Sequence, residues 1–407
     1  MRTDIDRHMR EQGLAGLVVF AYDRACAPMY YVTGQKLHFA IWFRAADGRE
    51  HLVHDPMERD QAAASGLEHS SFAAHRLSQL QEEEGGPVRA FARIIADMLG
   101  SMGVTGRVAF HGDMPPATAY ALLQRVVELA PSISIDAAPA DVLTLARTTK
   151  DERELAVIRK ASGAAVSAIE RTLELLRSLR RDGAGLVDER GEAVRLGRIR
   201  RLIQREFLEH GFAEDGESIV AQGRDAGVPH NRGNDDDVLR PGTPLLIDIF
   251  PGEAGGGWHT DMTRTYCVGP APEPLKQLHA DVNEAFTRVM SSLRVGQQCR
   301  SYQELTCDVF EQRGHPTVRS KPGTEEGYCH GLGHGVGLAV HEPPRLGGPP
   351  SNAQVLEPGM VITIEPGLYY PSRGLGVRIE DLVVVRPNGT FENYTPAPYE
   401  LEIAPRG

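Results

Sequence analysis

One template occurs twice in the chain, as Leu239-Arg-Pro-Gly-Thr-Pro-Leu-Leu-Ile-Asp248 and as Leu356-Glu-Pro-Gly-Met-Val-Ile-Thr-Ile-Glu365. Each copy reads Leu-x-Pro-Gly, then an apolar run typical of a strand, then a carboxylate. A second carboxylate follows after 13 residues in the first copy, at Asp261, and after 15 in the second, at Glu380. Helical patterns over residues 151–177 and about 275–294 precede the two copies. The repeat predicts a duplicated helix-and-strand unit that brings four carboxylates together, with chance similarity of two Pro-Gly turns as the alternative.

These four carboxylates would be costly to bury alone. Asp248 and Glu365 each end an apolar run, and Glu380 precedes another, Leu382-Val-Val-Val385. A carboxylate in such a strand needs a partner, and four that converge repel one another unless cations hold them. Together with one imidazole, such a set suits Mn²⁺, Co²⁺ or Zn²⁺. Taken singly, each acid is more often a salt-bridged or edge residue, so the metal hypothesis depends on their convergence.

An imidazole is available in the glycine-rich segment His330-Gly-Leu-Gly-His334-Gly-Val-Gly-Leu-Ala-Val-His341. A dinucleotide-binding fingerprint is disfavoured, because Val336 stands where its third glycine would be. The HExxH zinc motif is excluded because glycine follows His330, and so many glycines oppose a helix. A glycine-rich backbone can approach a ligand closely, so the segment indicates a site. A loop with clustered histidines and no ligand is the alternative.

The ordered set Asp248, Asp261, His334, Glu365 and Glu380 resembles the five metal ligands of the pita-bread metallopeptidases, which include methionine aminopeptidase, Xaa-Pro aminopeptidase and prolidase. The surrounding motifs are similar as well: Asp261-Met-Thr-Arg-Thr265, His330-Gly-Leu-Gly-His334-Gly-Val-Gly, Glu365-Pro-Gly-Leu-Tyr369 and Arg378-Ile-Glu-Asp381. The resemblance covers residues 147–407 and implies an α+β fold with a catalytic pita-bread domain there. Residues 1–146 resemble, in size and in alternation of strands and helices, the smaller N-terminal α/β domain of the Xaa-Pro-specific and creatinase-like branch.

The resemblance implies two divalent metal ions, Mn, Zn or Co, bridged by a water or hydroxide that attacks the peptide bond. On this analogy Asp248 binds one ion in bidentate fashion, and Asp261 and Glu380 bridge the two ions. His334 and Glu365 complete the shell of the second ion, and Glu365 is also the candidate proton shuttle. General chemistry agrees, because two close cations acidify a shared water and stabilise a tetrahedral oxyanion.

Five further positions match contacts that the family makes with substrate. His230 falls where a histidine contacts substrate or leaving group, His341 where one meets the scissile carbonyl, and His330 where one supports the site. Arg345 stands where prolidases carry an arginine that grips the C-terminal carboxylate of a dipeptide, a task that suits a guanidinium fork. Arg378 either orients substrate or pairs with a ligand carboxylate. A surface role for His230 and a structural role for Arg345 are the alternatives.

The resemblance therefore favours a metallopeptidase that cleaves the Xaa-Pro bond of dipeptides, with a small proline-containing peptide as substrate and a homodimer as the assembly. The nearest alternative is an Xaa-Pro aminopeptidase, which has the same metals and accepts longer peptides. Non-peptide chemistry on the same fold, creatinase-like or lyase activity, is a second alternative, although creatinase lacks the acidic metal set. A catalytically silent binding module is a third, and its usual mark is the loss of metal ligands.

Composition limits the class of protein. The chain has 407 residues, a formal net charge of −11, 41% hydrophobic and 24% charged residues, which is ordinary for a globular protein. The acidic balance disfavours nucleic acid as a partner, and arginines between Arg171 and Arg205 alternate with acids as on a solvated helical surface. Five cysteines without a CxxC pair favour a reducing compartment. No apolar run approaches ~18 residues, so we expect a cytoplasmic protein without a membrane partner.

Local patterns predict the remaining elements. Strands are expected around residues 17–20, 40–43 and 51–54, and helices over 87–102, 117–129 and about 192–210. Thr149-Lys-Asp-Glu152 has the form of a capping box at the start of the helix over 151–177. Two features depart from the family pattern: Ile249-Phe250 after the first ligand, and long segments at 250–260 and 183–200. The run Asp235-Asp-Asp237 is interpreted as an exposed turn, because consecutive side chains cannot all face one ion.

Overall fold

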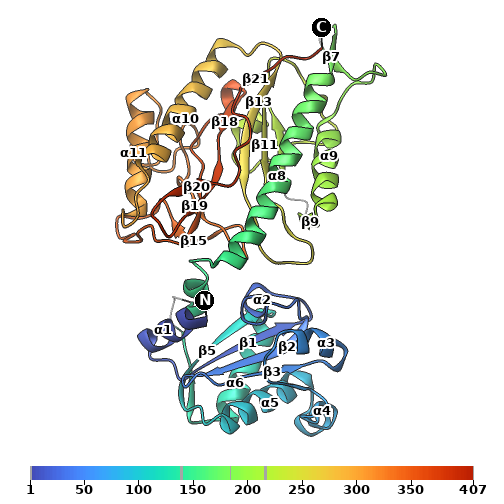
Figure 1. The fold of residues 1–407 in the computed structure, drawn as a ribbon, viewed down its shortest axis with the longest axis vertical. Helices are drawn as coiled ribbons and strands as arrows, with labels where there is room; N and C mark the ends of the chain where they lie inside the picture. The colour runs from blue at the N-terminus through green and yellow to red at the C-terminus, as the bar shows by residue number, and fades with distance from the viewer. Residues whose placement is uncertain (1, 138–140, 184, 215–217, 407) are drawn as a thin grey trace. The chain divides into compact units, whose positions relative to one another are not determined.

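The computed structural model describes residues 2–137, 141–183, 185–214 and 218–406 (Figure 1). The chain divides into two compact units, Met1–Arg147 together with Gly255–Gly257, and Thr148–Ala254 together with Trp258–Gly407. No helix within the described ranges is both long enough and apolar enough to cross a membrane.

The first unit is built on a six-stranded sheet in the order β4-β3-β2-β1-β5-β6. Its strands are β1 Gly16–Tyr22, β2 Phe39–Ala45, β3 Glu50–His54, β4 His69–Ser71, β5 Gly106–Asp113 and β6 Ile133–Ile135. Its helices are α1 Arg2–Gln12, α2 Ala27–Thr33, η1 Pro56–Glu58, α3 Arg59–Ala64, α4 Leu77–Glu84, α5 Pro87–Ser101, α6 Pro116–Leu129 and α7 Val142–Ala146. The three strands and two helices predicted for this region are confirmed.

Both faces of this sheet are buried, as the alternation of side chains along a strand requires. On one face Val18 of β1 packs in a core with Phe91 of α5. On the other, Leu17 of β1 packs in a separate core with Ile5 of α1. The first unit is thus a three-layer α/β domain, and none of the predicted site residues lies in it.

The first half of the second unit consists of two helices followed by antiparallel strands. Its elements are α8 Glu152–Ser178, β7 Arg180–Asp182, β8 Gly185–Val187, α9 Leu196–Glu209, β9 Phe212–Ala213, β10 Ile219–Gln222, η2 Asp225–Gly227, β11 Pro244–Ile249, β12 Gly252–Glu253 and β13 Met262–Val268. Strands β10, β11 and β13 form one sheet with β21 Glu402–Ile403 at its edge. The long segment at 183–200 contributes β8 and the start of α9, and residue 184 lies outside the described residues.

The second half repeats this order. Its elements are α10 Glu273–Ser292, α11 Cys299–Gln312, β14 His334–Gly335, β15 Glu342–Arg345, β16 Val361–Ile364, β17 Gly367–Tyr370, η3 Pro371–Arg373, β18 Leu375–Arg378, β19 Asp381–Val385 and β20 Phe391–Asn393. The second sheet has the order β15-β14-β16-β19-β20, and β17 and β18 form a separate hairpin. The repeated helix-and-strand order that the Leu-x-Pro-Gly template predicts is present, with β11 and β16 as its two strands.

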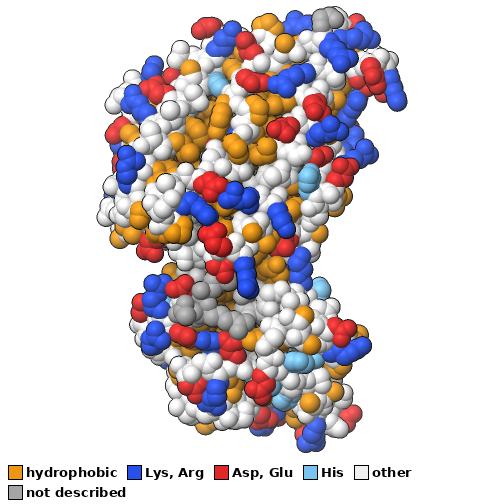
Figure 2. All heavy atoms as spheres, in the orientation of Figure 1, with side chains coloured by type: hydrophobic (Ala, Val, Ile, Leu, Met, Phe, Trp, Pro, Cys, Tyr) orange, Lys and Arg blue, Asp and Glu red, His pale blue; other side chains and the backbone are white. Residues whose placement is uncertain are grey.

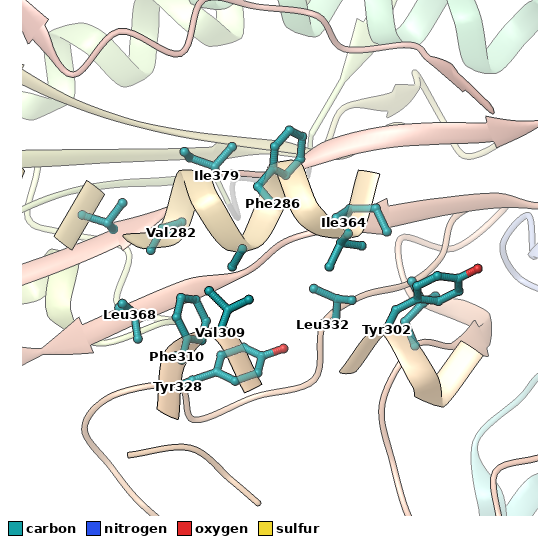
Figure 3. Close-up of a cluster of buried hydrophobic side chains, with 14 of the residues drawn as sticks. Val282, Phe286, Tyr302, Val309, Phe310, Tyr328, Leu332, Ile364, Leu368 and Ile379 are labelled. Atoms are coloured by element: carbon teal, nitrogen blue, oxygen red, sulfur yellow. The ribbon is translucent and has the colours of Figure 1, made fainter. Parts of the chain in front are cut away.

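Each half buries the apolar faces of its helices against its own strands. Figure 3 shows Val282 and Phe286 of α10 beside Phe310 of α11, with Ile364 and Ile379 from the strand side of the same core. An equivalent core joins α8, α9, β11 and β13. Because every buried apolar group removed from water stabilises the fold, these two cores hold both sheets in place.

Two helix starts differ from the prediction. The cap of α8 is Asp151, whose carboxylate accepts from the backbone N–H groups of Arg153 and Glu154. Thr149 instead forms a bridge with Met360, and this extended pairing keeps it out of the helix. The capping box is therefore two residues later than predicted.

Helix α9 begins at Leu196 rather than near Glu192. Arg195 is extended and forms a bridge with Val238, so the preceding residues belong to strand-like structure. The residues Leu196, Ile199, Ile203 and Phe207 form the buried apolar face of α9. Figure 2 shows mixed positive and negative side chains along the edge of the molecule where α9 lies.

Candidate metal centre

The four repeated carboxylates lie at the ends of strands from both sheets. Asp248 is on β11 and Asp261 immediately precedes β13. Glu365 follows β16, and Glu380 lies between β18 and β19. A backbone bridge between Thr263 and Glu380 joins the two halves at this point. The tandem repeat thus places one pair of acids from each half at a common centre.

His334 faces this centre from β14. Its Nδ1–H donates to the carbonyl oxygen of Gly335 at 3.1 Å, so Nε2 carries the lone pair. Nε2 lies 3.3 Å from Glu365 Oε1 and 3.7 Å from Asp261 Oδ2. The tautomer that the backbone imposes is the one a metal ligand needs.

Close backbone packing explains the glycines around His334. A Cβ on Gly333 would lie 2.1 Å from the carbonyl oxygen of Thr363, and one on Gly335 would lie 2.0 Å from that of Pro343. Any side chain there would push β14 away from its neighbours β16 and β15. The glycines are therefore needed to seat His334 between two strands.

Three of the five predicted ligands meet the spacing of a single cation. One donor atom each of Asp261, His334 and Glu380 lie within 4.8 Å of one another, and all three residues are buried. Asp248 and Glu365 line the same cavity, which has a volume of about 820 Å³. All five predicted ligands therefore border one cavity.

The acids at this centre need compensating positive charge. Burial, then the charges of Glu380, Asp248 and Glu365, raise the pKa of Asp261 well above its ordinary value. Burial and Glu380 act likewise on the pKa of Glu365, and burial with Asp248 raises the pKa of Glu380 to about 8. Burial followed by His341 lowers the pKa of His334 to about 3. Several close carboxylates beside a neutral imidazole form an environment that favours binding of a cation.

The donor set passes a direct test of fit for a divalent cation. Oδ1 of Asp248 and Oδ1 of Asp261 are buried and have no hydrogen-bond partner within the described residues. Buried carboxylate oxygens without partners are costly, and a divalent cation satisfies them. Oxygen donors with one imidazole suit Mn²⁺, Co²⁺ and Zn²⁺.

Arg378 ties this centre together from β18. Its Nη2 donates to Asp248 Oδ2, its Nε donates to Thr263 Oγ1 at 3.0 Å, and its Nη1 donates to the Tyr369 hydroxyl at 2.8 Å. Thr263 Oγ1 in turn donates to Glu380 Oε2 at 2.6 Å. Arg378 is 3% exposed, and its guanidinium is engaged with protein groups although it borders the cavity.

The predicted histidines surround the same cavity. His330 donates from Nδ1 to the Gly331 carbonyl at 2.7 Å and accepts at Nε2 from the Tyr369 hydroxyl at 2.9 Å. The His341 ring lies 4.3 Å from that of His334, centroid to centroid. His230 is exposed in the loop before β11. The three histidines thus share one cavity with the acids.

Arg345 ends β15 and is exposed to the cavity, directly opposite His334 in the strand register. Its backbone is held by hydrogen bonds to Gln354 and Asn352. Burial is the main cause that lowers the pKa of His341 below its ordinary value, and the positive charge of Arg345 is the second cause. The guanidinium therefore favours the neutral form of His341.

Sequence reasoning missed two residues of this network, Thr263 and Tyr369. Both lie within the quoted motifs, at the third position of Asp261-Met-Thr and the fifth of Glu365-Pro-Gly-Leu-Tyr. The available signal was that Thr263 and Tyr369 lie in strands that begin one or two residues after the candidate ligands Asp261 and Glu365. The long 250–260 segment contributes Phe250 to the cavity wall, and the acidic run at 235–237 is a turn in which Asp235 pairs with Arg200.

Comparison with known proteins identifies the family. Residues 156–387 match metallopeptidase family M24. The chain is 32% identical over 265 residues to a probable dipeptidase PepE of Mycobacterium tuberculosis, covering 65% of this chain and 63% of that protein. It is 30% identical over 249 residues to an Xaa-Pro dipeptidase of Pyrococcus furiosus, covering 61% of this chain and 64% of that one. These matches span less than two thirds of either relative.

Solved structures cover the whole chain. An Xaa-Pro dipeptidase from Bacillus anthracis has a TM-score of 0.77 at 23% identity, covering 99% of both chains. An X-Pro aminopeptidase from Thermotoga maritima has a TM-score of 0.75 at 22% identity, covering 98% of this chain and 99% of that one. The predicted pita-bread fold is thereby confirmed. Because the dipeptidase and the aminopeptidase have similar TM-scores to this chain, the fold does not distinguish the two activities, and only the residues of the site can. By its matched residues, its fold and its ordered acids, the chain belongs to metallopeptidase family M24.

Proposed function

We propose that this protein is an Xaa-Pro dipeptidase that uses two divalent cations. The observation that carries the proposal is the meeting of four carboxylates and His334 at one cavity that also contains His230, His341 and Arg345. The named relatives support a dipeptidase, and two of those compared carry Xaa-Pro in their names.

Asp248, Asp261, His334, Glu365 and Glu380 would hold the cations. Two divalent cations, when bound, supply Lewis acidity and lower the pKa of water, which suits attack on a peptide carbonyl. Mn, Zn or Co fits the donor set equally. The number and identity of the ions are measured by metal analysis of the purified protein.

The remaining residues of the site bind and orient the substrate and transfer the proton that the reaction needs. Glu365 borders the cavity and accepts a proton from the attacking water, then returns it to the leaving nitrogen. His341 and His230 donate hydrogen bonds to the scissile carbonyl and the leaving group, and His330 supports them through Tyr369. Arg345 binds the C-terminal carboxylate with its guanidinium fork.

Arg378 acts as a positioning residue in this proposal. Its contacts to Asp248, Thr263 and Tyr369 orient a ligand and a supporting histidine together. Substrate binding by Arg378, which the sequence also suggests, would require it to release one of these partners.

The same proposal extends to the organisation of the chain. Residues 1–146 form the smaller N-terminal domain and 147–407 the catalytic domain, a division supported by the two compact units and by the match over 156–387. A homodimer in the cytoplasm remains a prediction, which sedimentation analysis and cell fractionation test.

A paired rate assay tests the activity. Protein stripped with chelator and resupplied with Mn²⁺ is given Ala-Pro and Ala-Pro-Ala. Cleavage of Ala-Pro alone supports the dipeptidase and the role of Arg345. Preference for Ala-Pro-Ala assigns an aminopeptidase, and no cleavage of either with Mn²⁺, Zn²⁺ or Co²⁺ overturns the proposed function.

A further inference from the structure

A second arginine shares the cavity with Arg345. Arg232 lies two residues after His230 and lines the same cavity, and both arginines are exposed residues. In the part of the chain that the structure describes, neither side chain has an ion-pair or hydrogen-bond partner. Two arginines whose side chains form no ion pair among the described residues therefore line the cavity that we propose binds substrate.

The backbone of Arg232 is held firmly. Its carbonyl oxygen accepts from Arg200 Nη2 at 2.7 Å and from the Val220 N–H at 3.3 Å. The next residue, Gly233, has φ +73°, and a Cβ there would lie 2.1 Å from the Val220 carbonyl oxygen. A close contact that only glycine permits thus fixes the backbone of Arg232 beside the cavity that this residue lines.

Nearby acids are engaged elsewhere. Asp235 pairs with the buried Arg200, with 2.8 Å between Asp235 Oδ1 and Arg200 Nε. Glu214 accepts hydrogen bonds from Gln204 and Ser218. Arg232 lowers the pKa of Glu214 against the raising effect of burial, yet the two side chains form no ion pair among the described contacts. The charge of Arg232 stays available to a ligand.

A dipeptide ending in proline presents one carboxylate to Arg345, and the proline ring has no second charge. A second anionic group on such a substrate must come from the amino-side residue. We propose that Arg232 is a specificity residue that binds an acidic side chain there, so that the preferred substrates are Glu-Pro and Asp-Pro. This inference rests on the proposed Xaa-Pro dipeptidase function.

Matched substrates test the inference. Glu-Pro and Gln-Pro differ in charge at nearly equal shape. With Mn²⁺-loaded protein we expect kcat/KM to favour Glu-Pro about tenfold, mainly through KM, because a charge-assisted contact remote from the scissile bond binds ground and transition states alike. In Arg232→Gln the ratio of the two substrates should fall to about one. Arg240→Gln, an exposed arginine outside the cavity, should keep the wild-type ratio.

A binding measurement separates this inference from the proposed activity. Calorimetry on metal-free protein should show tighter binding of Glu-Pro than of Gln-Pro, with the difference lost in Arg232→Gln. Equal binding of the two dipeptides, or a preference that survives Arg232→Gln, overturns the role of Arg232. If Ala-Pro is cleaved without any preference for Glu-Pro, the dipeptidase stands and only the acidic specificity fails.

Discussion

Lys150 Nζ lies 3.6 Å from Glu342 Oε2, and both side chains are almost completely buried, at 0% and 1% exposed. Lys150 just precedes α8, whereas Glu342 follows His341 directly and begins β15. Glu342 Oε1 also accepts from the Ala339 N–H at 3.0 Å. This buried pair therefore connects the start of the second unit to the loop that contains His341.

Removing one partner of this pair should be costly. Lys150→Met leaves the Glu342 charge buried, and we expect the free energy of unfolding to fall by about 3–5 kcal/mol. Adding Glu342→Gln should restore part of that loss, since the buried negative charge is then removed together with its cationic partner. Urea denaturation of metal-free protein measures both, with Arg171→Met as control because Arg171–Glu174 is an exposed ion pair. Losses that simply add in the double variant would refute the coupling.

Loss of a metal ligand should abolish turnover without unfolding the chain. In Asp261→Ala or His334→Ala we expect Ala-Pro hydrolysis at the background rate and a lower metal content, because both donors border the same cation position. Rates in metal-defined buffer, elemental analysis and circular dichroism check this. Asp236→Ala, at an exposed acid in the turn, is the matched control. Normal rates in the ligand variants would mean that the site is misassigned.

Acid crowding should make the metal-free protein sensitive to pH. Burial and the charge of Asp248 raise the pKa of Glu380 in the folded state to about 8, whereas the unfolded chain releases this proton near the ordinary value of 4.5. The folded state binds more protons between these values, so its stability falls as pH rises through that window. Denaturation midpoints at pH 5 and 8 should differ less in Glu380→Gln than in wild type. If the two midpoints differ as much in Glu380→Gln as in wild type, Glu380 is not the source of the pH dependence of stability.

Arg345 should matter more for dipeptides than for longer peptides. In Arg345→Ala we expect kcat/KM to fall about a hundredfold for Ala-Pro and much less for Ala-Pro-Ala, whose terminal carboxylate lies one residue further from the scissile bond. Most of the loss should be in KM. Steady-state kinetics on both peptides check this, and equal losses would argue against a carboxylate clamp.

Much of the framework followed from local pattern. The apolar strands around β1, β2, β11 and β16 and the amphipathic α5, α6 and α9 were predicted because their periodicity lies within a few residues of sequence. The start of α8 was not, because Thr149 fits a capping box equally well until its bridge to Met360 is formed. The backbone bridge between Thr149 and Met360, far apart in sequence, therefore decided where α8 begins.

The sequence by itself determined the order and identity of the candidate ligands, since Asp248, Asp261, His334, Glu365 and Glu380 each lie in a motif whose chemistry is legible locally. Only the tertiary structure decided what each neighbour does. Arg378 reaches Asp248 across 130 positions of sequence, and Arg200 holds the backbone of Arg232 beside the cavity. The first contact joins the two halves and the second joins a helix to a loop within one half, so no local periodicity encodes either.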